Sequence, residues 1–188
     1  MFNKYKDKIK KCANKIAGKD CNKYEFPLMV AKELGVSRVY GNGIYYMTTY
    51  MYAIPTSNTY TVYGLLDDNL VMITIVAQIV HNDVVRFNSS TLNSTNIIIR
   101  DLCTRNENNE IVFKILDECN FGIIDSIYAS KKQVRISFFQ VNKSGIDSLC
   151  KKYNNIKYKG VMGKCLCIDL KQSPVKESYG YIFDFDLL

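Results

Sequence analysis

The chain has 188 residues, of which 47% are hydrophobic and 23% are charged, with a formal net charge of +7. This hydrophobic content is typical of a globular core and excludes a wholly disordered chain, while the length fits one domain or two small lobes. The longest apolar run, 70–80, is interrupted by Thr74 and Gln78 and is too short to span a bilayer.

The N-terminal sequence MFNKYKDKIKKC is charged where a secretory signal would be apolar, so we expect a cytoplasmic protein. The seven cysteines contain no CxxC pair, and this spacing favours neither a disulfide framework nor a zinc site. We therefore expect no metal and no cofactor, and we interpret most cysteines as small buried hydrophobic residues.

Residues 1–19 hold seven lysines and one acid, Asp7. Apolar residues recur there every three or four positions, which predicts an amphipathic helix that ends near Gly18. We expect this basic helical arm, 1–19, to precede one β-rich domain, 20–188. The arm has three interpretations: a helix packed on the domain with its lysines in water, an arm that binds nucleic acid or an acidic partner, or a membrane-surface helix.

The remaining elements alternate between short strands and turns. A helix is predicted over 29–34, a tight turn at the Gly-Asn-Gly of 41–43, and strands over 44–54, 59–66 and 70–80, with breaks at 55–58 and 67–69. Further strands are predicted at 81–87, 97–99, 110–116, 122–128, 133–141, 156–158, 164–170 and 179–185, and a helix at 144–153. This pattern predicts a mainly β fold, either a barrel or a sandwich.

Half of the fourteen tyrosines lie between Tyr40 and Tyr63. Tyrosines on paired strands are usually half-buried packing residues, although they can also form a stacking platform for nucleobases. Such platforms interleave basic residues with the aromatic ones, and here Arg38 alone is near in sequence. We therefore favour packing.

His81 is the single histidine and allows one protease hypothesis. His81 would be the base, Asp101 would orient it, and Cys165 in Gly163-Lys164-Cys165 would be the nucleophile. This order resembles the viral chymotrypsin-like cysteine proteases, but Leu166 stands where that family has glycine. The alternative is that His81 is a strand-end residue without a catalytic role and that Cys165 belongs to an ordinary strand.

A second resemblance rests on Tyr24-Glu25-Phe26-Pro27, on Val30-Ala31, on Val39-Tyr40 before the glycine turn, and on the segment 163–167. These segments are similar to the poxins, the cyclic GMP-AMP nucleases of poxviruses and their insect and baculoviral relatives. The resemblance implies a chymotrypsin-like double β-barrel, with the N-terminal helix and one helix near 144–154.

Poxins activate the 2′-hydroxyl of their substrate with a metal-independent set of His, Tyr and Lys, which removes a proton and aligns the attack. Tyr24 stands at the position of the family's histidine, and the Tyr-x-x-Ile-Lys pattern matches Tyr153 and Lys157. Aligning the preceding helix would instead place Lys143 and Asp147 there. We therefore take Tyr24, Tyr153 and Lys157 as candidate catalytic residues, and Lys143 and Arg38 as candidate ligand-binding residues.

The expected function is binding, with or without cleavage, of a cyclic dinucleotide such as 2′,3′-cGAMP, which would counter innate immune signalling in the host cytosol. If the chain is an enzyme on this interpretation, it is a metal-independent phosphodiesterase. The alternatives are a cysteine protease that uses His81 and Cys165, and a non-enzymatic factor that binds a host protein. Expected partners are the cyclic dinucleotide and an acidic partner for the arm. The sequence leaves the oligomeric state open, with a homodimer among the alternatives.

Overall fold

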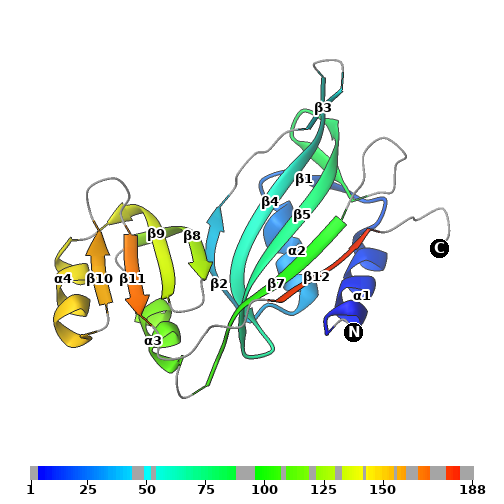
Figure 1. The fold of residues 1–188 in the computed structure, drawn as a ribbon. Coiled ribbons are helices and arrows are strands. Elements are labelled where there is room, and N and C mark those ends of the chain that lie inside the picture. Colours follow the sequence, from blue (N-terminus) through cyan, green and yellow to red (C-terminus); the bar gives the residue numbers. More distant parts are fainter. Residues whose placement is uncertain are drawn as a thin grey trace.

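The computed structural model describes residues 4–43, 49–51, 54–87, 96–106, 109–118, 122–129, 133–141, 143–154, 156–159, 165–169 and 177–182. The described fold is mainly β, as predicted (Figure 1). Its helices are α1 (Lys6–Ile16), α2 (Phe26–Leu34), α3 (Glu110–Glu118) and α4 (Lys143–Lys152). Its strands are β1 (Asp20–Asn22), β2 (Arg38–Gly43), β3 (Thr49–Met51), β4 (Ile54–Leu66), β5 (Asn69–His81), β6 (Val84–Arg86), β7 (Asn96–Thr104), β8 (Gly122–Ala129), β9 (Gln133–Val141), β10 (Ile156–Lys159), β11 (Cys165–Asp169) and β12 (Glu177–Ile182).

These strands form one sheet with the order β1-β6-β5-β4-β2-β8-β9-β11-β10. Outside this path, β7 pairs with both β5 and β12, and β3 pairs with β4. Its centre is the long β4–β5 hairpin, which turns at Asp67 and Asp68 with φ of 48° and 62°. Two consecutive positive φ values are typical of the hairpin turn whose twist matches its strands, and the turn predicted at 67–69 is confirmed. Among the described residues the path runs open from β1 to β10, so the double barrel stays a prediction.

The first core lies between the long strands and the two N-terminal helices (Figure 1). Ile9, Cys12, Ala13 and Ile16 of α1 are all buried there, at no more than 3% exposure. Because these residues recur at helical spacing, one face of α1 is apolar and packs on the sheet. The packed-helix interpretation of the N-terminal segment is therefore confirmed, and the division into an arm and a domain stays a prediction.

The second core gathers α3, α4 and the inner face of β8 and β9, and its further members come from β4, β5, β7 and β10. On β4, Val62 faces the first core and Tyr63 the second, and on β5 Val71 and Leu70 divide in the same way. Successive side chains of a strand point to opposite faces, so the central strands separate the two cores. The molecule thus has two lobes that share its longest strands.

Three predictions about the elements are wrong. The tight turn predicted at 41–43 lies inside β2, where all three residues pair with β4. Residues 110–116 form part of helix α3 rather than a strand, because Val112, Phe113, Ile115 and Leu116 are buried at helical spacing and cover the second core. The break predicted at 55–58 lies inside β4, where Pro55 pairs with Tyr50 of β3 near the beginning of the strand. Proline is tolerated at such a position, where no central ladder needs its missing N–H.

Within the described part of the chain, none of the helices has the length and apolar character needed to cross a membrane.

Candidate functional site

The predicted protease residues do not meet. His81 is exposed at the end of β5, whereas Asp101 on β7 pairs with Val71, ten residues earlier on β5. At the rise of an extended strand this separates His81 from Asp101 by roughly 30 Å. Cys165 begins β11, and β4, β2, β8 and β9 lie between β5 and β11 in the sheet order. The hypothesis of a His81, Asp101 and Cys165 triad is therefore wrong.

Asp101 instead belongs to a buried polar cluster with Tyr5 and Asn69, all at 2% exposure or less. The Tyr5 hydroxyl donates to Asp101 Oδ1 at 2.5 Å, and Asn69 Nδ2 donates to the Tyr5 oxygen at 3.0 Å. Burial, the largest cause, raises the pKa of Tyr5 above its usual value, so the phenol stays protonated and keeps donating. Lys4 Nζ lies 3.9 Å from Asp101 Oδ2. This cluster attaches the beginning of α1 to the sheet.

The predicted nuclease residues are also dispersed. Tyr24 is 53% exposed between β1 and α2, and the Tyr24 N–H donates to Asn22 Oδ1 at 2.9 Å. Tyr153 follows α4 and packs on the second core. Lys157 lies on β10, so Tyr153 and Lys157 do not share a helical face as predicted. β1 and β10 occupy the two ends of the sheet path and lie well apart in Figure 1, so the structure does not bring Tyr24 together with Tyr153 and Lys157.

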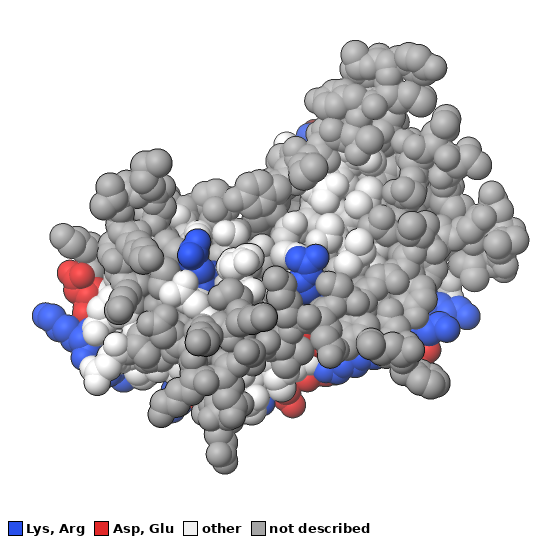
Figure 2. Space-filling view, viewed as in Figure 1, with Lys and Arg blue, Asp and Glu red and all other residues white. Residues whose placement is uncertain are grey.

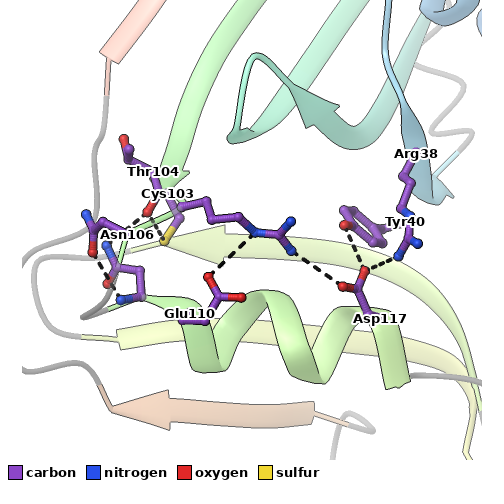
Figure 3. A network of polar contacts seen from close by, with 9 residues as sticks. Arg38, Tyr40, Cys103, Thr104, Asn106, Glu110 and Asp117 are labelled. Carbon is purple, nitrogen blue, oxygen red and sulfur yellow. Dashed lines mark hydrogen bonds and ion pairs between the residues drawn. The ribbon is translucent and has the colours of Figure 1, made fainter.

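The two predicted ligand-binding residues lie in different elements. Lys143 is the first residue of α4, and its side chain falls outside the described part of the structure. Arg38 begins β2 and forms an ion pair with Asp117 of α3, with its side chain 58% exposed (Figure 3). The carboxylate of Asp117 raises the pKa of Arg38, which therefore remains a cation.

The ion pair of Arg38 and Asp117 belongs to a larger network, which lies where β2 and the end of β7 meet helix α3 (Figure 3). The Tyr40 hydroxyl donates to Asp117 Oδ1 at 3.1 Å, and Arg105 Nη2 lies 3.4 Å from Asp117 Oδ2. Arg105 Nε is 3.7 Å from Glu110 Oε2, and the guanidinium lies 4.4 Å from the centre of the Phe113 ring. Burial, followed by the charge of Asp117, raises the pKa of Tyr40. With its two cations and two carboxylates, this network is internally neutralised.

The lysines of α1 are partly neutralised in the same manner. Lys8 Nζ pairs with Asp67 at 3.1 Å and Lys15 Nζ with Glu33 at 2.7 Å, in addition to the contact of Lys4 with Asp101. On the face drawn in Figure 2, the Lys and Arg side chains that are coloured lie apart from one another rather than in one continuous patch. The expected acidic partner of this segment stays a prediction.

A different group of residues has the character of a binding surface, namely the outer face of β8 and β9. Tyr128 is 56% exposed near the end of β8, and its direct cross-strand partner is Arg135, which is also exposed. The next pair on the same face is Ser126 with Ser137. The alternate residues of both strands, including Ile127 and Ile136, are buried in the second core. The strands therefore place a large aromatic ring and a guanidinium side by side on the outside.

The sheet register extends this row across two further strands. Arg135 pairs with Cys167 of β11, and Cys167 pairs with Lys157 of β10. We call the four positions Tyr128, Arg135, Cys167 and Lys157 the Tyr128 row. At the usual spacing of neighbouring strands, the Cα positions of Tyr128 and Lys157 are roughly 14 Å apart. Lys157, which the sequence suggested as a catalytic residue, thus lies in the same row as Tyr128 and Arg135, which the sequence analysis did not select.

The chemistry that this face offers is recognition. An exposed aromatic ring can stack on a nucleobase, and a guanidinium binds a phosphate through paired N–H donors. Among the described residues, no three His, Cys, Asp or Glu side chains gather as a metal site would require. The signal that could have identified the face was the alternation over 126–128 and 133–137, which pairs Tyr128 with Arg135 if the two strands form a hairpin.

Comparison of the chain with protein-family models, with curated proteins and with solved structures finds no match.

Proposed function

We propose that this chain binds a cyclic dinucleotide, and that Tyr128 and Arg135 on the outer face of β8 and β9 form the centre of the binding site. The observation that carries the proposal is the direct cross-strand pairing of Tyr128, which is 56% exposed, with an exposed arginine. A large aromatic ring that is presented to solvent directly beside a cation, between residues that are buried on the other face of the strand, favours a ligand.

The two side chains suit the two chemical parts of a nucleotide. Stacking of a base on an aromatic ring contributes about 1–3 kcal/mol, and it needs no particular base because every base has a π face. Directly opposed residues have Cβ atoms about 5 Å apart, so one nucleotide can contact the ring with its base and the guanidinium with its phosphate. The hydroxyls of Ser126 and Ser137 form the neighbouring pair on this face and could bond to ribose or phosphate oxygens.

The choice of a cyclic dinucleotide, among phosphate-bearing nucleotides, rests on the resemblance of segments 24–27, 30–31, 39–40 and 163–167 to the poxins. The chymotrypsin-like double barrel that the resemblance implies is part of the same proposal. We propose binding without cleavage, because Tyr24 follows β1 at one end of the sheet path, Lys157 lies on β10 at the other end, and His81 lies on β5. Sequestering the messenger would lower its free concentration and weaken host signalling.

Calorimetric titration with 2′,3′-cGAMP and with the other common cyclic dinucleotides tests this proposal. Loss of stacking in Tyr128→Ala should weaken binding by about tenfold or more, and Arg135→Ala should do the same through the lost phosphate contact. Tyr24→Ala and Arg86→Ala are matched controls, because they remove an equally exposed tyrosine and an arginine from the other lobe. Both controls should bind as tightly as the unmodified chain.

Chromatography of the ligand after incubation completes the test. The proposal expects the dinucleotide to be recovered intact. Absence of binding to every member of the panel would refute the proposed ligand, and unchanged affinity in Tyr128→Ala would refute the proposed site. Cleavage products that persist in both Tyr128→Ala and Arg135→Ala would show that an active site lies elsewhere.

A further inference from the structure

The sheet has two halves that meet at a narrow seam. The first half comprises β1 to β7 and β12, and the second half comprises β8 to β11. Their junction is between β2 and β8, and among the described residues it consists of one parallel pair, Gly41 with Ile124. By contrast, β4 and β5 are joined by ten consecutive pairs. A single bridge supplies little resistance to twisting, so other contacts must set the angle between the halves.

The last turn of α3 breaks a local rule of helix electrostatics. Asp117 and Glu118 stand there, and residues 115–118, all of them described, include no Lys or Arg. The C-terminal end of a helix carries a partial negative charge, so carboxylates at this end destabilise the helix unless cations from elsewhere compensate. A local conflict of this kind indicates that the residues serve a contact outside their own element.

The compensating cations come from the first half of the sheet and from helix α4. Arg38 of β2 and Arg105, which follows β7, pair with Asp117, and Tyr40 donates to the same carboxylate. Lys152, at the end of α4, pairs with Glu118 at 3.3 Å. The guanidinium of Arg105 also stacks on the ring of Phe113, which stabilises its position beside Asp117. Two neighbouring carboxylates on one helix turn therefore connect the first half to α4, which packs with the second half.

We propose that the acidic last turn of α3 is an ionic clasp that sets the orientation of the two halves of the sheet. The second core also crosses the seam, through Tyr63, Leu70 and Leu102, so release of the clasp loosens the joint without separating the halves. The clasp groups are partly exposed, with Asp117 at 33% and Arg38 at 58%, and are accessible to salt. This inference is independent of the proposed ligand.

Hydrogen exchange measured by mass spectrometry on the full chain tests the clasp. Asp117→Asn removes the charge that Arg38 and Arg105 share, and amides of β8 and β9 should exchange about three- to tenfold faster while those of β4 and β5 keep their rates. Asp20→Asn is the matched control, because Asp20 pairs with Arg86 at 2.6 Å entirely within the first half. The control should leave exchange of β8 and β9 unchanged.

A second comparison avoids dependence on one variant. Arg38→Gln leaves the contact of Arg105 with Asp117 and should accelerate β8 and β9 less than Asp117→Asn. In the unmodified chain, raising sodium chloride from about 50 to 500 mM should accelerate the same amides relative to those of β4 and β5. Equal acceleration of amide exchange in both halves would overturn the clasp, and global unfolding of Asp117→Asn counts as this outcome. Exchange rates that respond neither to the two substitutions nor to salt would also overturn it.

Discussion

Tyr5 joins the N-terminal helix to the sheet through one hydroxyl group. The phenol is fully buried, donates to Asp101 and accepts from Asn69, so its removal leaves two buried polar groups with fewer partners. An unsatisfied buried group costs more than an ordinary hydrogen bond contributes, since folding has already removed it from water. The role of Asp101 is structural for the same reason: its carboxylate accepts a hydrogen bond from Tyr5 and lies near the ammonium group of Lys4, both just before α1.

Tyr5→Phe keeps the ring and removes this hydroxyl. We expect the free energy of unfolding in urea to fall by about 1–3 kcal/mol, because Asp101 and Asn69 lose their shared partner. Tyr24→Phe is the control, since Tyr24 is 53% exposed and lies outside the buried cluster. Equal stability of the Tyr5→Phe protein and the unmodified chain would show that the buried cluster contributes nothing to the attachment of α1.

At the scale of elements, β2 and β4 approach each other closely at Gly64. A Cβ atom on Gly64 would lie 2.4 Å from the carbonyl oxygen of Arg38 and 2.5 Å from Val36 Cγ1. The register between these strands shifts beside this point, between Val39 and Gly41, and such bulges often bring backbones close together. Gly64 is thus required by packing against backbone, which cannot rotate away as a side chain can.

Gly64→Ala should therefore lower the free energy of unfolding by about 1–3 kcal/mol or more through overpacking. Gly18→Ala provides the comparison. Gly18 has a φ of +71° but nothing within 4 Å of its added Cβ, so its cost of about 1 kcal/mol comes from backbone strain alone. Thermal unfolding of both proteins ranks the two effects, and a larger loss in Gly18→Ala would contradict the crowding at β2.

Helix α3 shows where element prediction failed. The run 110–116 is rich in β-branched and aromatic residues, which favours a strand when it is considered alone. In the structure the side chains of Val112, Phe113, Ile115 and Leu116 all reach the second core, which a helix allows and an alternating strand does not. Burial of one apolar face in the tertiary structure therefore outweighed the local preference of these residues for a strand.

At the scale of the whole molecule, several groups with ionisable protons are buried in the two cores. Burial raises the pKa of the Cys12 thiol to about 12 in the first core and that of the Cys103 thiol to about 12 in the second, from an ordinary value of 9.0. The folded chain therefore keeps protons that the unfolded chain releases above pH 9. Stability must fall as pH rises between about 9 and 12, and these groups leave it constant below that window.

We expect urea unfolding in the presence of a reductant to show this loss, at about 1 kcal/mol per pH unit for each thiol above pH 9. The slope should be smaller in Cys12→Ala, whose starting stability at pH 7 is also lower because of the cavity. Cys21→Ala is the control, since Cys21 is less buried and its pKa is raised less by burial. Identical slopes in all three proteins would contradict burial of the Cys12 thiol as a cause.

Local patterns in the sequence determined the elements whose signal is contained within a few residues. The helical spacing of Ile9, Cys12 and Ile16 identified α1 and its buried face, and Asp67-Asp68 marked the central hairpin turn. Both depend on neighbouring residues along the chain, so periodicity and turn chemistry suffice. The mainly β character followed from the same kind of evidence.

The partners of each strand were decided by the tertiary structure. A strand pattern shows which residues share a face, but the hydrogen-bonding groups of its edges are the same in every strand and do not specify a neighbour. Pairing of β5 with β7 placed Asp101 far from His81, and pairing of β9 with β8 and β11 placed Arg135 between Tyr128 and Cys167. Residues distant in sequence became a candidate site because of this non-local pairing, which periodicity along one segment cannot encode.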